Sequence, residues 1–353
     1  MALVGRAGQR VTTPLVVRLT DVAARAGVSL ATASRVVNGS TRAVGAEISE
    51  HVLAVAADLG YLPNANAQAI ARGTSKLIGL IVNDIADPYF SVIASGAMRV
   101  AEQHGMLLLG STHNRPEQEL AYVAMLRAQR AQALILVGSR TTDTAHEKRL
   151  AAEVAAFRAA GGRVAAISQN KLGADTVLVE NRSGARALAR ALFAAGHRRF
   201  AVFAGPPALL TARDRARGFA DGLTAEGIAP VAHINGAFTR DGGYAAAEQL
   251  LSGGDLPDCV FVAADVMALG AMAAFRDNGV RVPHDVGVAG FDDITTLRDV
   301  TPSLTTVRLP LLHMGQLVCE MALDQRAGDK PRVVRVQGEI VIRESTARNR
   351  VRK

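Results

Sequence analysis

The sequence predicts a small all-α unit followed by a larger α/β core that contains two parallel sheets. The first observation is a change of pattern near residue 76. Residues 18–62 carry only helix signals, whereas from Lys76 onward short apolar runs alternate with helical stretches. The second observation is length, because 353 residues exceed what one ordinary hydrophobic core holds. The chain is therefore expected to form two or three domains.

Three short helices are predicted in the all-α unit. Thr20 and Ser29 are expected to cap the first two, because a side-chain hydroxyl at a helix start can accept from a free backbone N–H. Gly27 is expected to end the first helix. Two short helices joined by a glycine-containing turn form the helix-turn-helix pattern. The expected helices cover residues 21–26, 30–38 and 46–59.

Short, continuously apolar strands define the core. Such strands, separated by amphipathic helices such as those near residues 182–195 and 243–251, are typical of parallel sheets covered on both faces. The span is long enough for two such sheets in tandem. The predicted strands cover residues 77–82, 106–111, 133–137, 163–168, 176–180, 199–205, 259–265 and 285–293.

The charge distribution indicates a polyanionic partner. The formal net charge is +8. Residues 1–76 contain eight basic and four acidic residues, so half of the excess lies in about a fifth of the chain. A basic N-terminal unit favours nucleic acid as the partner. Charge alone leaves open the alternative of a merely basic protein.

Few features of the sequence favour catalysis, a cofactor or export. Cys259 and Cys319 lie in apolar contexts and are expected to be buried thiols of a cytoplasmic protein. No Walker loop, GxGxxG after a strand, nucleophile elbow or metal-ligand cluster is present, so neither an enzyme nor a metal or cofactor is expected. No run resembles a secretory signal or a membrane span.

Several stretches together resemble the LacI/GalR family of bacterial transcription regulators. The resemblance covers residues 18–347 and implies a helix-turn-helix head, a hinge helix and a core of two subdomains like those of periplasmic sugar-binding proteins. It also implies a homodimeric regulator, most often a repressor, that binds a palindromic operator under control of a small molecule. The stretches are "RLTDVAARAGVSLATASRVVNGS", "LGYLPNANAQAIARG", "IGLIVNDIADPYF", "ENRSGARALARALFAAGHRRFAVFAGP", "TARDRARGF", "VFVAADVMALGAMAAF", "VRVPHDVGVAGFDD" and "TPSLTTVRLP".

The resemblance implies boundaries for each part of the chain. A flexible tail (1–17) is expected to precede the head (18–63) and the hinge helix (64–75). In the core (76–347), the N-subdomain is expected to hold residues 76–171 and 309–337, and the C-subdomain residues 172–308 and 338–347. The basic tail is expected to hold residues 348–353. The closing stretch "IRESTARNRVRK" (342–353) carries no leucine heptad, so a dimer is expected rather than a tetramer.

In the family, the second helix lies in the major groove, which implies a base-reading role for Leu30, Ala31 and Arg35. Arg35 can form a bidentate pair with guanine, whereas Leu30 and Ala31 offer only apolar contact with thymine methyl groups. In the third helix, positions where the family has a serine cap and a Thr-Arg pair read Gly45, Ile48 and Ser49, so fewer phosphate contacts are expected. The residues expected to hold phosphates are Ser29, Thr32, Ser34 and Asn38.

Ile70 matches the hinge position at which the family inserts a leucine into the minor groove. A wedge of this kind kinks the duplex and enlarges the interface. Ile70 is the one bulky residue of an Ala-rich segment, so the alternative is packing against its symmetry mate.

The resemblance also implies an effector pocket between the two core subdomains. Arg213 and Asp292 are expected to form a polar clamp and Phe238 to cover the apolar side of a sugar ring. Ser168 and Ala264 replace a common Asp and Asn, which removes two anchors for ring hydroxyls. A sugar or polyol remains the first choice of effector, and a nucleoside or another metabolite is the alternative. A solute-binding protein and an α/β enzyme are more remote alternatives. The expected effector-binding residues are Tyr89, Phe90, Ser168, Arg213, Phe238, Asp265, Asp292 and Gln316.

Overall fold

The computed structural model describes residues 17–38, 44–63, 75–113, 115–324 and 330–347. The chain divides into two compact units, Met1–Ser75 and Lys76–Lys353, which are treated separately below. The predicted hinge helix and Ile70 lie outside the described residues, as do the two tails apart from Val17.

The N-terminal unit contains the three predicted helices, α1 (Leu19–Arg25), α2 (Leu30–Asn38) and α3 (Ala46–Asp58). They pack around Val22, Ala33 and Val52, whose side chains are fully buried. Gly27 has a φ of 65°, a left-handed conformation that glycine adopts readily, and it forms the sharp turn between α1 and α2. The helix-turn-helix prediction is therefore confirmed.

The predicted cap of α1 was wrong. The N-cap position is Arg18, and Thr20 lies inside the first turn. The carboxylate of Asp21 caps the helix instead, because its Oδ2 accepts a 2.8 Å hydrogen bond from the backbone N–H of Arg18. An aspartate in the first turn also interacts favourably with the helix dipole.

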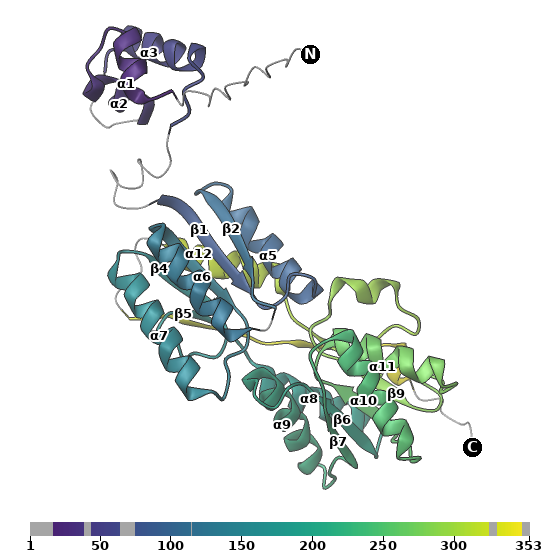
Figure 1. Cartoon of the computed structure of the whole chain (residues 1–353). Helices are drawn as coiled ribbons and strands as arrows, with labels where there is room; N and C mark the ends of the chain where they lie inside the picture. Colours follow the sequence, from purple (N-terminus) through teal and green to yellow (C-terminus); the bar gives the residue numbers. More distant parts are fainter. Residues whose placement is uncertain (1–16, 39–43, 64–74, 114, 325–329, 348–353) are drawn as a thin grey trace, which may run out of the picture. The chain divides into compact units, whose positions relative to one another are not determined.

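The N-subdomain of the core is built on a six-stranded sheet with the order β11-β5-β4-β3-β1-β2. Alternate residues of β1 face opposite sides, with Ile78 and Leu80 in one apolar cluster and Leu77 and Ile81 in the other. Helices α5 and α12 cover the first side, and α6 and α7 the second (Figure 1). The strands are β1 (Ser75–Val82), β2 (Met106–Ser111), β3 (Ala131–Val137), β4 (Arg163–Ile167), β5 (Asp175–Val179) and β11 (Val333–Val336), and the helices are α5 (Pro88–Ala101), α6 (Pro116–Ala128), α7 (Thr144–Ala159) and α12 (Leu311–Leu323).

The C-subdomain is built on a four-stranded parallel sheet with the order β7-β6-β8-β9. In its core the rings of Phe219 and Phe261 are stacked, with centroids 4.3 Å apart and planes 6° from parallel. The strands are β6 (Phe200–Ala204), β7 (Ala232–Asn235), β8 (Cys259–Val262) and β9 (Gly287–Ala289), and the covering helices are α8 (Asn181–Ala194), α9 (Leu210–Thr224), α10 (Arg240–Ser252) and α11 (Asp265–Asp277).

The predicted boundary between the subdomains at residue 172 is wrong. Strand β5 pairs in parallel with β4 and with β11, so it belongs to the N-subdomain. The first crossing therefore follows Val179, and α8 is the first element of the C-subdomain. The later division at residues 337 and 338 agrees with the structure, because β12 (Glu339–Val341) pairs with β10 (Thr306–Arg308) rather than with the six-stranded sheet.

The structure also bears on the expectations for the two cysteines and for membrane-spanning helices. Cys259 and Cys319 are buried thiols, as predicted, and burial raises the pKa of Cys319 to about 12. In the part of the chain that the structure describes, no helix has both the length and the apolar character needed to cross a membrane.

Candidate functional site

The second helix of the head presents its predicted reading face to solvent. Leu30, Ala31 and Arg35 are all exposed, and 49% of the Leu30 surface is accessible. Ala31 and Arg35 lie one helical turn apart and therefore share a face, while Ala33 points into the core of the head. This exposure leaves the three side chains available to a major groove.

The four predicted phosphate ligands also interact with one another. The hydroxyl of Ser29 accepts a 3.1 Å hydrogen bond from the backbone N–H of Thr32, so Ser29 caps α2 as predicted. The side-chain amide of Asn38 donates to Ser34 Oγ at 3.0 Å. Gly45 occupies the N-cap position of α3 without a side-chain hydrogen bond, which agrees with the expected loss of a capping hydroxyl there.

A pocket in the core lies between the two subdomains, at the carboxyl ends of strands from both sheets. Open α/β sheets bind ligands at this edge. The N-subdomain contributes residues that follow β1, β3 and β4, and the C-subdomain contributes the start of α9 and the loops after β7, β8 and β9. The lining residues are Asn83, Asp84, Asp87, Tyr89, Phe90, Gly138, Ser139, Ile167, Ser168, Gln169, Val179, Asn181, Leu209, Thr211, Arg215, Phe238, Ala264 and Asp292.

The polar centre of the pocket is a buried ion pair between Arg215 and Asp292. Arg215 Nη2 donates to Asp292 Oδ1 at 2.7 Å and Nη1 to Oδ2 at 3.1 Å. Nη1 also donates to the backbone carbonyl of Ala263 at 2.7 Å, and Nε to Asn181 Oδ1 at 2.8 Å. The guanidinium lies 4.0 Å from the centroid of the Phe291 ring. The charge of Arg215 is thus neutralised by a protein carboxylate.

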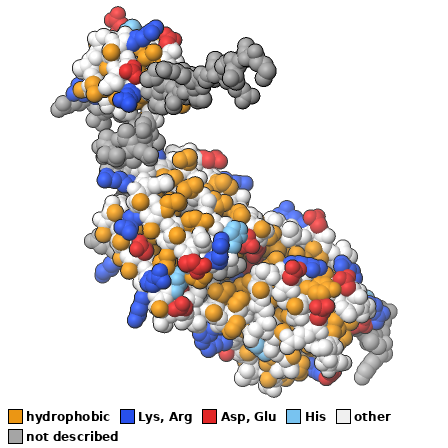
Figure 2. Space-filling view, in the orientation of Figure 1, with side chains coloured by type: hydrophobic (Ala, Val, Ile, Leu, Met, Phe, Trp, Pro, Cys, Tyr) orange, Lys and Arg blue, Asp and Glu red, His pale blue; other side chains and the backbone are white. Residues whose placement is uncertain are grey.

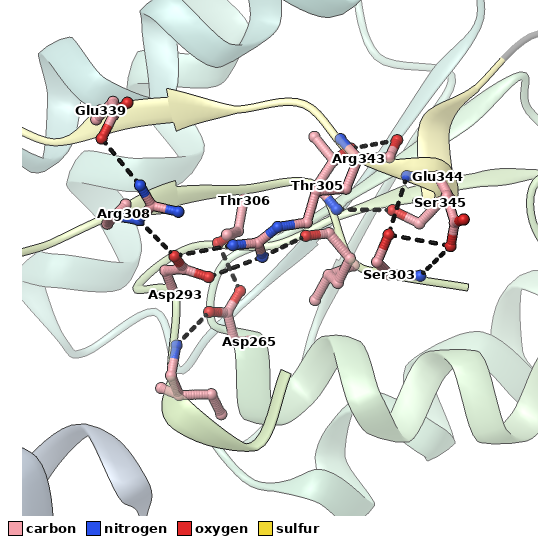
Figure 3. A network of polar contacts seen from close by, with 12 residues as sticks. Asp265, Asp293, Ser303, Thr305, Thr306, Arg308, Glu339, Arg343, Glu344 and Ser345 are labelled. Carbon is pink, nitrogen blue, oxygen red and sulfur yellow. Dashed lines mark hydrogen bonds and ion pairs between the residues drawn. The ribbon is translucent and has the colours of Figure 1, made fainter. Parts of the chain in front are cut away.

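The loop that carries Asp292 is held in an uncommon backbone conformation. Asp292 has a φ of 119° and Asp293 a φ of 56°, a region that side-chain-bearing residues rarely adopt. Such conformations persist where the surrounding structure fixes them, and they are found often at ligand sites. Arg308 and Arg343 both bind the carboxylate of the next residue, Asp293 (Figure 3).

Asp265 supports this loop from below and does not line the pocket. Its side chain is fully buried, where its Oδ1 accepts from the Thr306 hydroxyl at 2.7 Å and its Oδ2 from the backbone N–H of Ile294 at 3.1 Å (Figure 3). Its predicted contact with an effector is therefore wrong. Burial, followed by the negative charge of Asp292, raises the pKa of Asp265 to about 7.

Two further predicted ligands lie elsewhere. Arg213 is two residues from Arg215 on α9, a rotation of about 200° around a helix, so it faces away from the pocket. Gln316 lies on α12 beside Gly96 of α5, outside the pocket lining. Tyr89, Phe90, Ser168, Phe238 and Asp292 do line the pocket, as does Ala264.

Helical spacing on α9 indicates that Arg215 lies on the buried face of the helix, although its charge suggests an exposed position. On α9, Ala212, Ala216 and Phe219 are buried, and Arg215 occupies the same face by helical spacing. The polar residues Asn83, Ser139, Gln169 and Thr211 were also missed. Each follows a strand or begins a helix, but only the folded chain brings them to one cavity.

The pocket has an excess of negative charge. Its lining includes the carboxylates of Asp84, Asp87 and Asp292 and the guanidinium of Arg215. Burial, with smaller contributions from Asp292 and Asp84, raises the pKa of Asp87 to about 6, although its carboxylate caps α5 by accepting from the backbone N–H of Tyr89. A ligand with several hydroxyl donors suits these acceptors, and the aromatic rings of Tyr89, Phe90 and Phe238 offer apolar surfaces.

We expect Asp265 to make the core less stable as the pH rises. The folded state holds the Asp265 proton up to about pH 7, whereas the ordinary pKa of the group is 3.8, so the folded chain binds more protons between these values. The free energy of unfolding should fall by on the order of 2 kcal/mol from pH 5 to pH 7 through this group. Urea titrations at several pH values should show that the free energy of unfolding falls less steeply with pH in Asp265→Asn than in the wild type. An unchanged dependence on pH would contradict the raised pKa of Asp265.

Comparisons with known proteins identify both units. Residues 18–64 match the family described as bacterial regulatory proteins, lacI family, and residues 189–346 match a periplasmic binding protein-like domain. The chain is 35% identical to the HTH-type transcriptional regulator GalS of Salmonella typhimurium, over 88% of this chain and 91% of GalS. It is 32% identical to the transcriptional repressor PurR of Edwardsiella ictaluri, over 93% and 96% of the respective chains.

Solved structures agree with these matches. A lac repressor dimer bound to operator and the anti-inducer ONPF superposes with a TM-score of 0.78 and 30% identity, over 94% of this chain and 99% of that one. The regulator CelR in complex with cellobiose superposes with a TM-score of 0.67 and 28% identity, over 93% and 99%. The head has three helices, the core has two subdomains, and the likeness to these regulators extends over nearly the full length. The chain therefore belongs to the lacI family of bacterial regulatory proteins and is a DNA-binding transcriptional regulator.

Proposed function

We propose that the protein is a homodimeric repressor that binds a palindromic operator, and that a sugar or polyol bound between the core subdomains controls its affinity for DNA. The observation that carries the proposal is the pocket around Arg215 and Asp292, which both subdomains line. A ligand that contacts both sides favours one relative pose of the subdomains, and a ligand shifts an equilibrium only through different affinity for its states. GalS, PurR and the cellobiose-bound CelR support this reading by likeness.

In the head, we propose that Leu30, Ala31 and Arg35 read base edges. Ser29, Thr32, Ser34 and Asn38 hold phosphates in this proposal. The side-chain hydrogen bonds among them orient the hydroxyls and the amide before DNA arrives, which reduces the entropy lost on binding. Ile70 is proposed as the minor-groove wedge on the resemblance alone.

The charges of the pocket favour an uncharged effector. Arg215 carries the one guanidinium group of the described lining, and Asp292 already binds two of its nitrogens. A phosphate group would meet Asp84 and Asp87 without a free cation to pair with. A nucleoside is the second candidate, because it is also uncharged and can stack on an aromatic ring.

Among sugars that stabilise the protein, we expect the neutral form to bind at least about tenfold more tightly than its 6-phosphate, a difference of about 1.4 kcal/mol. The reason is repulsion by Asp84 and Asp87 together with the neutralised Arg215. Calorimetric titration of matched pairs, hexose against hexose 6-phosphate, measures the ratio. Tighter binding of the phosphorylated partner at this pocket would contradict the charge argument.

An apolar surface on the N-subdomain supports the homodimer. The edge strand β2 exposes Met106, whose surface is 68% accessible, together with Leu108 and Leu109. Met98 of the neighbouring helix α5 is exposed as well. Apolar side chains gather on the region of the core that holds β1 and β2 (Figure 2). Exposed apolar patches of this kind mark protein interfaces.

The experiment that tests the proposed function combines DNA selection with a metabolite screen. Selection of bound sequences from a random pool should return an inverted repeat, as a two-fold symmetric dimer requires. A thermal-shift screen of sugars, polyols and nucleosides should then find a stabilising compound, because a ligand that binds the folded state raises stability by mass action. Light scattering should show a dimer, and a monomer that still binds the repeat would contradict the dimeric mechanism.

A further inference from the structure

A second groove of the C-subdomain lies between α9 and the edge strand β7. Arg213 and Arg217 line it from the helix, and His233 and Asn235 line it from the strand. Small residues such as Gly205 and Ala216 border it. This groove, called the Arg213–Arg217 groove below, shares no lining residue with the pocket around Arg215.

The geometry of both elements explains why these side chains converge. Arg213 and Arg217 are four residues apart on α9 and so lie on one face, while Arg215 lies about 200° from Arg213 and enters the effector pocket. On β7, Ile234 is buried, so its neighbours His233 and Asn235 point to the opposite face of the strand. Figure 1 shows α9 and β7 in the same region of the C-subdomain.

The positive charge of this groove is not matched by a carboxylate of its described lining. Asp214 lies between the two arginines in sequence and interacts electrostatically with both, but its side chain also bonds Gln169, a residue of the effector pocket, and it is absent from the groove lining. Asp221, which lies near Arg217, is already paired with Arg182 and is likewise absent from the lining. Elsewhere in the C-subdomain, the exposed Arg182 and Arg281 each form an ion pair with an aspartate. The groove differs from these exposed pairs, because its lining brings two arginines together at one concave surface and includes no carboxylate.

The position of the groove also favours a ligand. Ala204 and Gly205 lie at the carboxyl end of β6, and Asn235 at that of β7, the edge at which open α/β sheets bind ligands. The small side chains of the lining let an anion approach the two guanidinium groups closely. Guanidinium groups donate paired N–H bonds to phosphate oxygens, and an imidazole and an amide add further donors.

We propose that the Arg213–Arg217 groove binds a small phosphate-bearing anion, either inorganic phosphate or a phosphorylated metabolite. The two sites of the core then have opposite charge preference: the pocket around Arg215 disfavours phosphate, and this groove recruits it. The site is additional to the proposed effector pocket and does not depend on the identity of that effector.

Hydrogen exchange of the full-length protein tests the proposal with a local readout. With inorganic phosphate replacing chloride at constant ionic strength, we expect slower amide exchange in peptides that cover residues 205–217 and 231–236. The double variant Arg213→Gln/Arg217→Gln should lose this protection, with an apparent Kd for phosphate at least about tenfold higher. The control Arg149→Gln, which removes an exposed arginine from α7, should keep it. Phosphate bound by the basic head appears separately, in peptides that cover residues 17–63.

Glucose 6-phosphate and glucose distinguish the sources of the anion. Protection by phosphate and by glucose 6-phosphate with similar Kd indicates a site for free phosphate, and much tighter binding of the sugar phosphate indicates a metabolite. Protection by glucose alone in peptides that cover residues 231–236, equal protection in the double variant, or none in the wild type would overturn the proposal. If circular dichroism shows that the double variant is unfolded, the exposed single change Arg217→Gln provides the same comparison.

Discussion

Arg215→Met is expected to lower the free energy of unfolding of the core by about 3–5 kcal/mol. The substitution keeps an unbranched side chain but leaves the buried carboxylate of Asp292 without its cation. Removing one partner of a buried ion pair is costly because the remaining charge has lost both water and its partner. Asn181 and the Ala263 carbonyl also lose a donor. Urea denaturation followed by circular dichroism measures the change.

Two variants separate this effect from the loss of any arginine on α9. Arg213→Met, on the other face of the helix, should change stability by less than about 0.5 kcal/mol. Arg215→Met combined with Asp292→Asn should recover much of the lost stability, because the isolated charge is gone and asparagine tolerates the positive φ of that position. Equal costs at Arg213 and Arg215 would show that the ion pair does not stabilise the core.

Arg35→Ala is expected to weaken specific operator binding by about 1–3 kcal/mol and to relax the preference at one symmetric base pair. Arg35 is exposed on α2, one turn from Ala31, and is the residue of the reading face that can pair with guanine. Binding curves for operators with single base-pair changes measure the effect at each position.

The matched control for Arg35 is Arg25→Ala, which removes an exposed arginine from the last turn of α1. This change should leave the relative preference among operator variants as it is in the wild type. If Arg35→Ala weakens all sequences by the same factor, Arg35 contacts phosphate and does not read a base.

Local signals predicted much of the fold. The second helix of the head has the predicted bounds, because the Ser29 cap and the apolar spacing are both local features. Strands β3 and β6 are largely buried apolar runs, and most of the predicted strands were found at the predicted places. Strand β7 was missed because three of its four residues are not buried, so it lacks the continuous apolar pattern.

The errors arose where position depends on distant parts of the chain. Strand β5 joins the N-subdomain through pairing with β11, and Asp175 binds Arg332, 157 residues away. No pattern within residues 172–180 indicates this partner. The choice between Arg213 and Arg215 likewise depended on helical phase, which the charged sequence of α9 obscures although its buried alanines indicate it.

The most direct test of the central claim is titration of operator DNA with and without a compound that stabilises the core. If the pocket around Arg215 controls DNA binding, the compound should change the operator Kd of the wild type and leave that of Asp292→Ala within a few-fold of its ligand-free value. A weaker operator complex with the compound identifies an inducer, and a stronger one identifies a corepressor. Identical wild-type titrations at saturating compound would contradict the claim that this pocket controls DNA binding.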